Sequence, residues 1–66
     1  MKTYYDVHVF YSRDDGFSVP VATDEPMSDE EVINVALENE DLDSEDAKHV
    51  DYVEEIDEDD YNDMKA

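Results

Sequence analysis

The chain has 66 residues and a formal net charge of −18, because 22 Asp and Glu residues outnumber four Lys and Arg residues. This length predicts one small domain, near the lower limit at which a hydrophobic core alone can offset the loss of chain entropy. The charge argues against direct binding to nucleic acid or to an anionic membrane, and the lack of Cys excludes a disulfide framework and favours a reducing, cytoplasmic compartment.

The acidic residues are unevenly distributed along the chain. Residues 1–23 contain three acids and two bases, whereas residues 24–66 contain 19 acids and two bases. Such a charge normally favours disorder, but 39% of the residues are hydrophobic and five are Tyr. We therefore expect a folded domain that loosens at low salt, where repulsion between its charges is least screened.

Residues 3–12 show the period-2 alternation of a β-strand. One face, which we expect to contact a helix, carries Tyr5, Val7, Val9 and Tyr11. The opposite face carries Tyr4, Asp6, His8 and Phe10. The pattern predicts a strand with one face in the core.

A turn at residues 13–16 is predicted to join this strand to a second one. The pair Asp15-Gly16 is of the kind that accepts positive φ in a tight hairpin. Residues 17–23 then alternate as a strand. Because Pro20 has no N–H to donate to a neighbouring strand, we expect this second strand to lie at the edge of the sheet.

The clearest predicted element is a helix over residues 28–39. Ser28 can cap its first turn, Glu31 completes a capping box, and Met27 can pack on Val32 as a hydrophobic staple. On a helical wheel the apolar side chains form one stripe. The stripe consists of Val32, Ile33, Ala36 and Leu37, with Val35 at its margin. It requires a sheet on which to pack.

A third apolar stretch, residues 48–53, predicts a strand in which Val50 and Tyr52 face the core, although Val53 and Ile56 fit this alternation poorly. A right-handed crossover through the helix places this strand beside the first one and gives the sheet order 2-1-3. The predicted fold class is therefore a small two-layer α+β domain of the β-β-α-β type, with one helix packed on one face.

The C-terminal residues 57–66 favour a second short helix, with Asp57 as its cap and Asp60 at the capping-box position. A helix this short is marginal in water, so its order depends on whether Tyr61 and Met64 reach the core. Two outcomes stay open: a docked helix, or a loosely attached tail.

Helix capping explains some of the acids. A cap followed three residues later by an acid occurs at Ser28, Asp43 and Asp57, and the middle one is predicted to start only a single turn. Acids in a first turn are stabilised by the helix dipole. These three turns contain 10 of the 22 acids, so more than half of the acids need another explanation.

The excess acids predict a surface that imitates nucleic acid. Duplex DNA carries about one negative charge per 1.7 Å of axis, and a folded row of carboxylates can occupy a groove lined by Lys and Arg. Under this hypothesis the protein is a non-enzymatic inhibitor of a basic nucleic-acid-binding host protein. The alternative is a solvated surface that only maintains solubility. The predicted partner-binding residues are Glu38, Glu40, Asp41, Asp43, Glu45, Asp46, Glu54, Glu55, Asp57, Glu58, Asp59 and Asp60.

A second hypothesis places a generic protein-protein contact on the sheet. Tyr4, His8 and Phe10 share the strand face that the helix does not cover, with Pro20 nearby, and exposed aromatic side chains are typical of interfaces. The protein would then be an adaptor or a homodimer. The sequence leaves open whether it is a monomer or a homodimer.

No catalytic or cofactor motif is present, so we expect a non-enzyme without a cofactor. The single Gly argues against a phosphate-binding loop, and no Ser-His-Asp or HExxH pattern occurs. An EF-hand count from Asp41 fails because Asp46 stands where the loop needs Gly. His8 and His49 have no second His or Cys at ligand spacing. We therefore predict no metal site, only weak and unspecific cation binding at residues 54–63.

The order of hairpin, capped acidic helix and the segment Asp41 to Asp46 leading into Val50-Asp51-Tyr52 resembles the small acidic DpnD/PcfM-like proteins, which phages and plasmids of Gram-positive bacteria carry. The resemblance covers residues 3–56. It implies a β-β-α-β core and a mobile-element origin, with no catalytic residues to transfer. A mobile-element origin favours a host restriction, CRISPR, repair or transcription protein as the partner.

Overall fold

The computed structural model describes residues 2–65. In chain order its elements are β1 (Thr3–Ser12), β2 (Asp15–Thr23), α1 (Asp29–Glu38), α2 (Ser44–Ala47), β3 (Val50–Ile56) and α3 (Glu58–Lys65). The sheet order is β2-β1-β3, with β1 antiparallel to both neighbours and β2 at an edge. The predicted α+β fold and strand order are therefore confirmed. Among the described residues, no helix combines the length and the apolar character needed to cross a membrane.

The core lies between β1 and α1. Tyr5, Val7 and Val9 of β1 are buried, and Val7 has no exposed surface. They belong to one cluster with Val32 and Ala36, the fully buried centre of the helical stripe. Burying an aliphatic side chain of this size stabilises the fold by about 1.5–3 kcal/mol. The predicted core face of β1 is confirmed, and so is that of α1 for Val32, Ala36 and Leu37. Val35, predicted at the margin of the stripe, also packs against this cluster, whereas Ile33 is only half-buried beside it.

The start of α1 fixes how this helix meets the sheet. The Ser28 hydroxyl oxygen accepts a hydrogen bond from the Glu31 N–H at 3.4 Å and donates one to Glu31 Oε1 at 3.1 Å. The predicted cap is thus present. The hydroxyl of Tyr5 in β1 accepts a hydrogen bond from the Met27 N–H at 3.0 Å. A buried side chain of the central strand therefore holds the residue that precedes the cap.

β3 contains a β-bulge that changes which face its side chains occupy. His8 of β1 lies opposite Tyr52 of β3. The next residue of β1, Val9, lies opposite Val50, so Asp51 is an extra residue in β3. The prediction that Val50 faces the core is confirmed. The prediction for Tyr52 is wrong: the extra residue turns its side chain to the other face, where it is 48% exposed.

The hairpin between β1 and β2 turns at residues 13–14, with Ser12 opposite Asp15. Gly16 lies inside β2 and does not have a positive φ. The predicted conformation of this glycine is therefore wrong. Its role comes from crowding instead, because a Cβ at Gly16 would lie 2.7 Å from the carbonyl oxygen of Val9.

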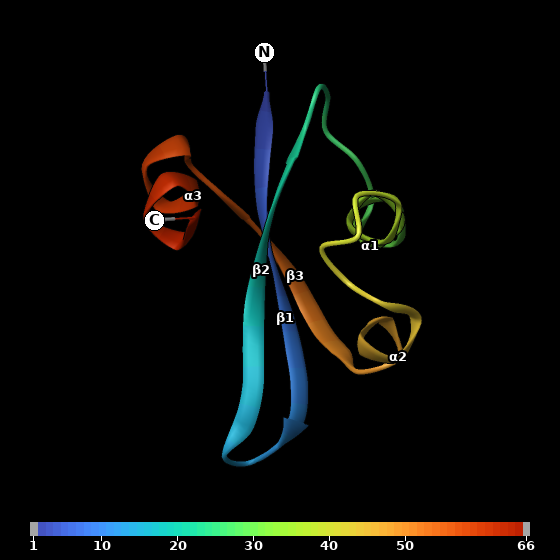
Figure 1. Cartoon of the computed structure of the whole chain (residues 1–66). Coiled ribbons are helices and arrows are strands. Elements are labelled where there is room, and N and C mark those ends of the chain that lie inside the picture. Colours follow the sequence, from blue (N-terminus) through green and yellow to red (C-terminus); the bar gives the residue numbers. More distant parts are fainter. Residues whose placement is uncertain (1, 66) are drawn as a thin grey trace.

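α3 packs on the sheet face opposite α1 and α2 (Figure 1). Its first turn is capped by Asp57, whose Oδ1 accepts a hydrogen bond from the Asp60 N–H at 2.8 Å. The Tyr61 ring lies 4.7 Å from the ring of Tyr4 in β1. The Tyr4 hydroxyl donates a hydrogen bond to Glu58 Oε2 at 2.9 Å. The tail is thus a docked helix, and a third layer joins the two that the sequence predicted.

We predict that Gly16→Ala destabilises the protein, because the added methyl group would overlap the Val9 carbonyl and force the backbone to move. The expected loss in the free energy of unfolding is about 1–3 kcal/mol, measured by urea denaturation. Ser12→Ala is the control, since Ser12 is exposed in the same hairpin and such changes cost less than about 0.5 kcal/mol. Equal stability of the two variants would contradict crowding at Gly16.

Candidate functional site

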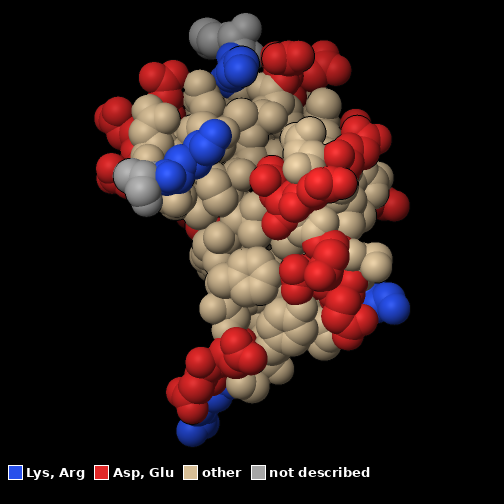
Figure 2. Space-filling model, viewed as in Figure 1, with Lys and Arg blue, Asp and Glu red and all other residues tan. Residues whose placement is uncertain are grey.

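The carboxylates of residues 2–65 have no Lys or Arg partner. Within residues 2–65, no Lys or Arg nitrogen lies within 4.0 Å of a carboxylate oxygen, and the ion contacts at that distance involve only His8 and His49. Figure 2 shows acidic side chains at the upper left and along the right side of the displayed face, with mostly uncharged surface and basic side chains between them. Most of the described carboxylates are therefore exposed to solvent without a Lys or Arg partner.

Half of the predicted partner-binding residues lie between the end of α1 and α2. This α1–α2 group consists of Glu38, Glu40, Asp41, Asp43, Glu45 and Asp46. The positive φ of Glu40, 63°, ends α1 and turns the chain toward Leu42, which is only 3% exposed and anchors the connection in the core. Asp43 caps α2 by accepting a hydrogen bond from the Asp46 N–H at 2.7 Å. The single turn predicted here is confirmed.

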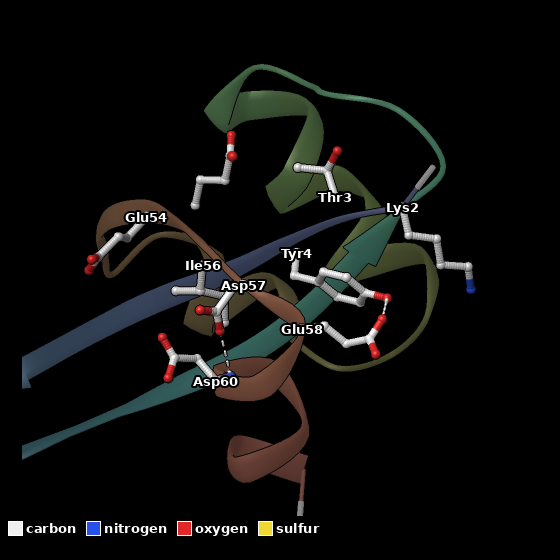
Figure 3. A pocket seen from close by; sticks show the side chains of 9 residues that line it. Lys2, Thr3, Tyr4, Glu54, Ile56, Asp57, Glu58 and Asp60 are labelled. Atoms are coloured by element: carbon white, nitrogen blue, oxygen red, sulfur yellow. Dashed lines mark hydrogen bonds between the residues drawn. The ribbon is translucent and has the colours of Figure 1, made fainter.

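The other half lies where β3 leads into α3. This β3–α3 group consists of Glu54, Glu55, Asp57, Glu58, Asp59 and Asp60. All of its members except Asp59 line one shallow hollow of about 630 Å³ (Figure 3). The remaining lining residues are Lys2, Thr3, Tyr4 and Ile56. The structure thus gathers five of the predicted residues around a single depression.

The carboxylates of the hollow divide into structural and free groups. Asp57 caps α3, and Glu58 accepts the Tyr4 hydroxyl, as the dashed lines in Figure 3 show. The hydrogen bond to Glu58 raises the pKa of Tyr4, because it stabilises the neutral phenol. The side chains of Glu55 and Asp60 accept no hydrogen bond from any described residue. These two carboxylates can receive a cation from a partner.

The two acidic groups do not form one patch. The α1–α2 group belongs to the layer on the core face of the sheet, and most of the β3–α3 group belongs to the layer on the other face (Figure 1). The edge strand β3 connects the two. The sequence could predict the members of the set, but their division between two layers depends on where α3 docks.

The uncovered part of the outer sheet face carries exposed aromatic side chains. Phe10 is 53% exposed and Tyr52 is 48% exposed. The ring of Tyr52 stacks on the His8 imidazole with centroids 4.1 Å apart. We call Phe10, Tyr52 and His8 the aromatic strip. Tyr4, which the sequence placed on this surface, is covered by α3. Tyr52 was missed because the sequence assigned it to the core. The poor fit of Val53 and Ile56 to the alternation was the available sign that the register of this strand changes.

Comparisons with protein-family models, with curated proteins and with solved structures found no match. The resemblance to DpnD/PcfM-like proteins therefore stays a prediction that depends on the sequence pattern. The function has to be inferred from the geometry of the surface. That geometry offers unpaired carboxylates and an acidic hollow, which suit the binding of cationic groups.

A tyrosine connects the α1–α2 group to the central strand. The Tyr11 hydroxyl donates a hydrogen bond to Asp46 Oδ1, and the Tyr11 ring lies 4.4 Å from that of His49. The hydrogen bond stabilises the neutral phenol, and deprotonation would place a second negative charge beside Asp46. Together with desolvation of the phenol, these effects raise the pKa of Tyr11 to about 12. The contact therefore persists to high pH.

We predict that the stability contributed by this contact is fully present below pH 10 and is lost between pH 10 and about 12. In that interval the folded protein retains a proton that the unfolded chain releases. Tyr11→Phe cannot lose this proton, so its unfolding free energy should fall less steeply over the same interval. Urea denaturation at closely spaced pH values measures the difference. Identical pH profiles for the variant and the parent protein would refute the contact.

Proposed function

We propose that this protein is a non-enzymatic inhibitor that binds a basic nucleic-acid-binding protein in place of nucleic acid. The observation that supports this most strongly is that, within residues 2–65, none of the four Lys and Arg side chains lies within 4.0 Å of a carboxylate oxygen. A partner's Lys or Arg can therefore approach these acids without first displacing an internal ion pair. The attraction between the two surfaces is then available for binding.

The arrangement of the acids supports the same proposal. The α1–α2 group and the β3–α3 group lie in different layers, on opposite sides of the sheet (Figure 1). The two phosphate backbones of a duplex likewise flank a groove. A basic cleft that normally closes around a duplex would meet negative charge on both sides of this protein.

The hollow at the β3–α3 group offers a seat for one basic side chain. Asp60 would receive the ammonium or guanidinium group, for which charge-assisted hydrogen bonds are the strongest polar contacts. Ile56 and Tyr4 line the same hollow and would cover the apolar stem of that side chain. The hollow would thus add specificity to an otherwise diffuse attraction.

Binding of this kind would be fast and dependent on salt, because long-range attraction steers the encounter and is screened by ions. The resemblance to DpnD/PcfM-like proteins implies a phage or plasmid origin. A host restriction, CRISPR, repair or transcription protein is the partner that such an origin favours. An inhibitor that occupies its nucleic-acid groove would block it by competition.

A second candidate function is contact with a protein or with a second copy of this chain through the sheet. The exposed Phe10 and Tyr52 of the aromatic strip favour it. In that case the acids would serve only to keep the protein soluble. Salt and DNA would then have little effect on the complex.

Affinity capture from a bacterial lysate at low and at high salt tests the proposal, with the bound proteins identified by mass spectrometry. We expect a basic nucleic-acid-binding protein that is retained at low salt, eluted by high salt and displaced by added duplex DNA. A retained protein that resists both salt and DNA would instead support the aromatic strip.

Three variants with the same change of charge locate the binding surface on the captured partner. The first neutralises the α1–α2 group by Glu38→Gln, Glu40→Gln, Asp41→Asn and Glu45→Gln. The second neutralises one acid of β3 and three acids of α3 by Glu55→Gln, Asp59→Asn, Asp60→Asn and Asp63→Asn. The control neutralises acids outside both groups by Asp14→Asn, Asp15→Asn, Asp24→Asn and Glu25→Gln. None of these changes removes a helix cap or the acceptor of a Tyr hydroxyl.

We expect the first and second variants to bind the partner at least about tenfold more weakly. The control should lose only the small part of the affinity that depends on the net charge of the whole protein. Affinities are compared by surface plasmon resonance at one fixed salt concentration. An equal loss for all three variants would mean that only total charge matters. Loss of binding in Phe10→Ala with Tyr52→Ala, but in none of the acidic variants, would refute nucleic-acid mimicry.

A further inference from the structure

Three side chains of the kind that bind metal ions meet on the outer face of the sheet. They are Asp6 and His8 of β1 and Glu54 of β3. His8 Nε2 lies 2.8 Å from Asp6 Oδ2 and 3.9 Å from Glu54 Oε2. One ligand atom from each residue lies within 4.8 Å of the other two. A single ion could contact all three.

The strand register creates this cluster. Asp6 and His8 are two residues apart in β1 and therefore point to the same face. Glu54 lies directly opposite Asp6 in the pairing of β1 with β3. The three side chains therefore extend from two paired strands, and the positions of the ligands are set by the sheet rather than by a loop.

The same register leaves polar atoms without compensation. Like charges directly opposite each other on neighbouring strands repel, as the carboxylates of Asp6 and Glu54 do here. The Asp6 side chain is only 14% exposed, and its Oδ1 is buried without a hydrogen-bond partner. The same holds for Nε2 of His8. A cation among these atoms would relieve the repulsion and satisfy the buried atoms.

The orientation of the His8 ring favours a bound ion over a simple hydrogen-bonded pair. Nδ1 lies 3.2 Å from the Ser18 hydroxyl oxygen. When Nδ1–H donates to that oxygen, the neutral ring presents the Nε2 lone pair to the carboxylates. Asp6 Oδ2 is close to Nε2 but lacks hydrogen-bond geometry, so it lies off the axis along which an Nε2–H would point. An ion bound to Nε2 on that axis would have Asp6 Oδ2 beside it as a second ligand.

We propose that Asp6, His8 and Glu54 bind one divalent transition-metal ion, for which Zn²⁺ is the probe. One imidazole nitrogen and two carboxylate oxygens are ligands that Zn²⁺ accepts, whereas Mg²⁺ and Ca²⁺ prefer oxygen ligands alone. Asp6 and His8 supply prearranged ligands. Glu54, whose side chain is 60% exposed, can move inward to become the third. Three protein ligands leave a tetrahedral ion one position for water.

The argument for this site does not rest on the proposed inhibitor function, although Glu54 also lines the hollow of the β3–α3 group. The site departs from the prediction that the chain has no metal site. That prediction considered ligand spacings along the sequence, those of His and Cys and those of an EF-hand loop. Glu54 is far from His8 in the sequence and becomes its neighbour only through the pairing of β3 with β1.

Titration of Zn²⁺ into the ¹⁵N-labelled full-length protein tests the proposal, with the imidazole nitrogens followed by NMR. His49 is an internal control, because its Nε2 lies 3.7 Å from the single carboxylate of Glu45. We expect the His8 signals to saturate at one equivalent of Zn²⁺ while those of His49 change little, and a large excess of Mg²⁺ not to reverse the change. Parallel changes of His8 and His49 would overturn the proposal, since they would indicate diffuse binding by the acidic surface.

Glu54→Gln and Glu55→Gln form a matched pair of variants. The two residues are neighbours in β3, both are exposed and each variant loses one negative charge, but only Glu54 belongs to the cluster. We expect Glu54→Gln to weaken Zn²⁺ binding at least about tenfold and Glu55→Gln to change it less than about twofold. His8→Gln should abolish the one-to-one complex. Equal effects of the two Glu variants in calorimetric titration would also overturn the proposal.

Discussion

The central position of β1 is the constraint on which the rest of this structure depends. A chain of 66 residues with a charge of −18 depends on a small apolar core. The side chains on the two faces of β1 contact both layers of helices. On one face Val7 is fully buried and the Tyr5 hydroxyl holds the start of α1. On the other face Tyr4 contacts the ring of Tyr61 in α3 and bonds Glu58. The acids of both layers can then point to solvent.

Local rules were sufficient to predict the strands and the helix caps, because these depend on residues close together in the sequence. The sheet order followed from the right-handed crossover through the helix. Ser28, Asp43 and Asp57 all accept a backbone N–H three residues on. Two predictions failed where tertiary pairing overrides the local pattern. The bulge at Asp51 reverses the face of Tyr52, and the requirement for Gly16 comes from a carbonyl on the neighbouring strand rather than from its own φ.

The candidate sites show the same limit. Composition alone identified the acidic residues, and their exposure follows from charge. The hollow of the β3–α3 group could not be predicted, because it forms only when α3 docks over Tyr4. The cluster of Asp6, His8 and Glu54 likewise needs the register between β1 and β3. Glu54 belongs to both sites, so a metal ion bound there would remove one of the carboxylates that the mimicry proposal uses. Glu55 would remain free.

The most direct test of this account is amide hydrogen exchange, followed by NMR, because it reports whether β1 holds both layers at once. We expect the β1 amides to exchange most slowly, at the rate of global unfolding. We also expect clear protection of the Tyr61 amide, which donates to the Asp57 carbonyl at 3.0 Å in the first turn of α3. Exchange of the α3 amides at the rate of a free peptide, with β1 still protected, would contradict the account. The outer layer would then not be docked, and the acidic hollow would not be a fixed site.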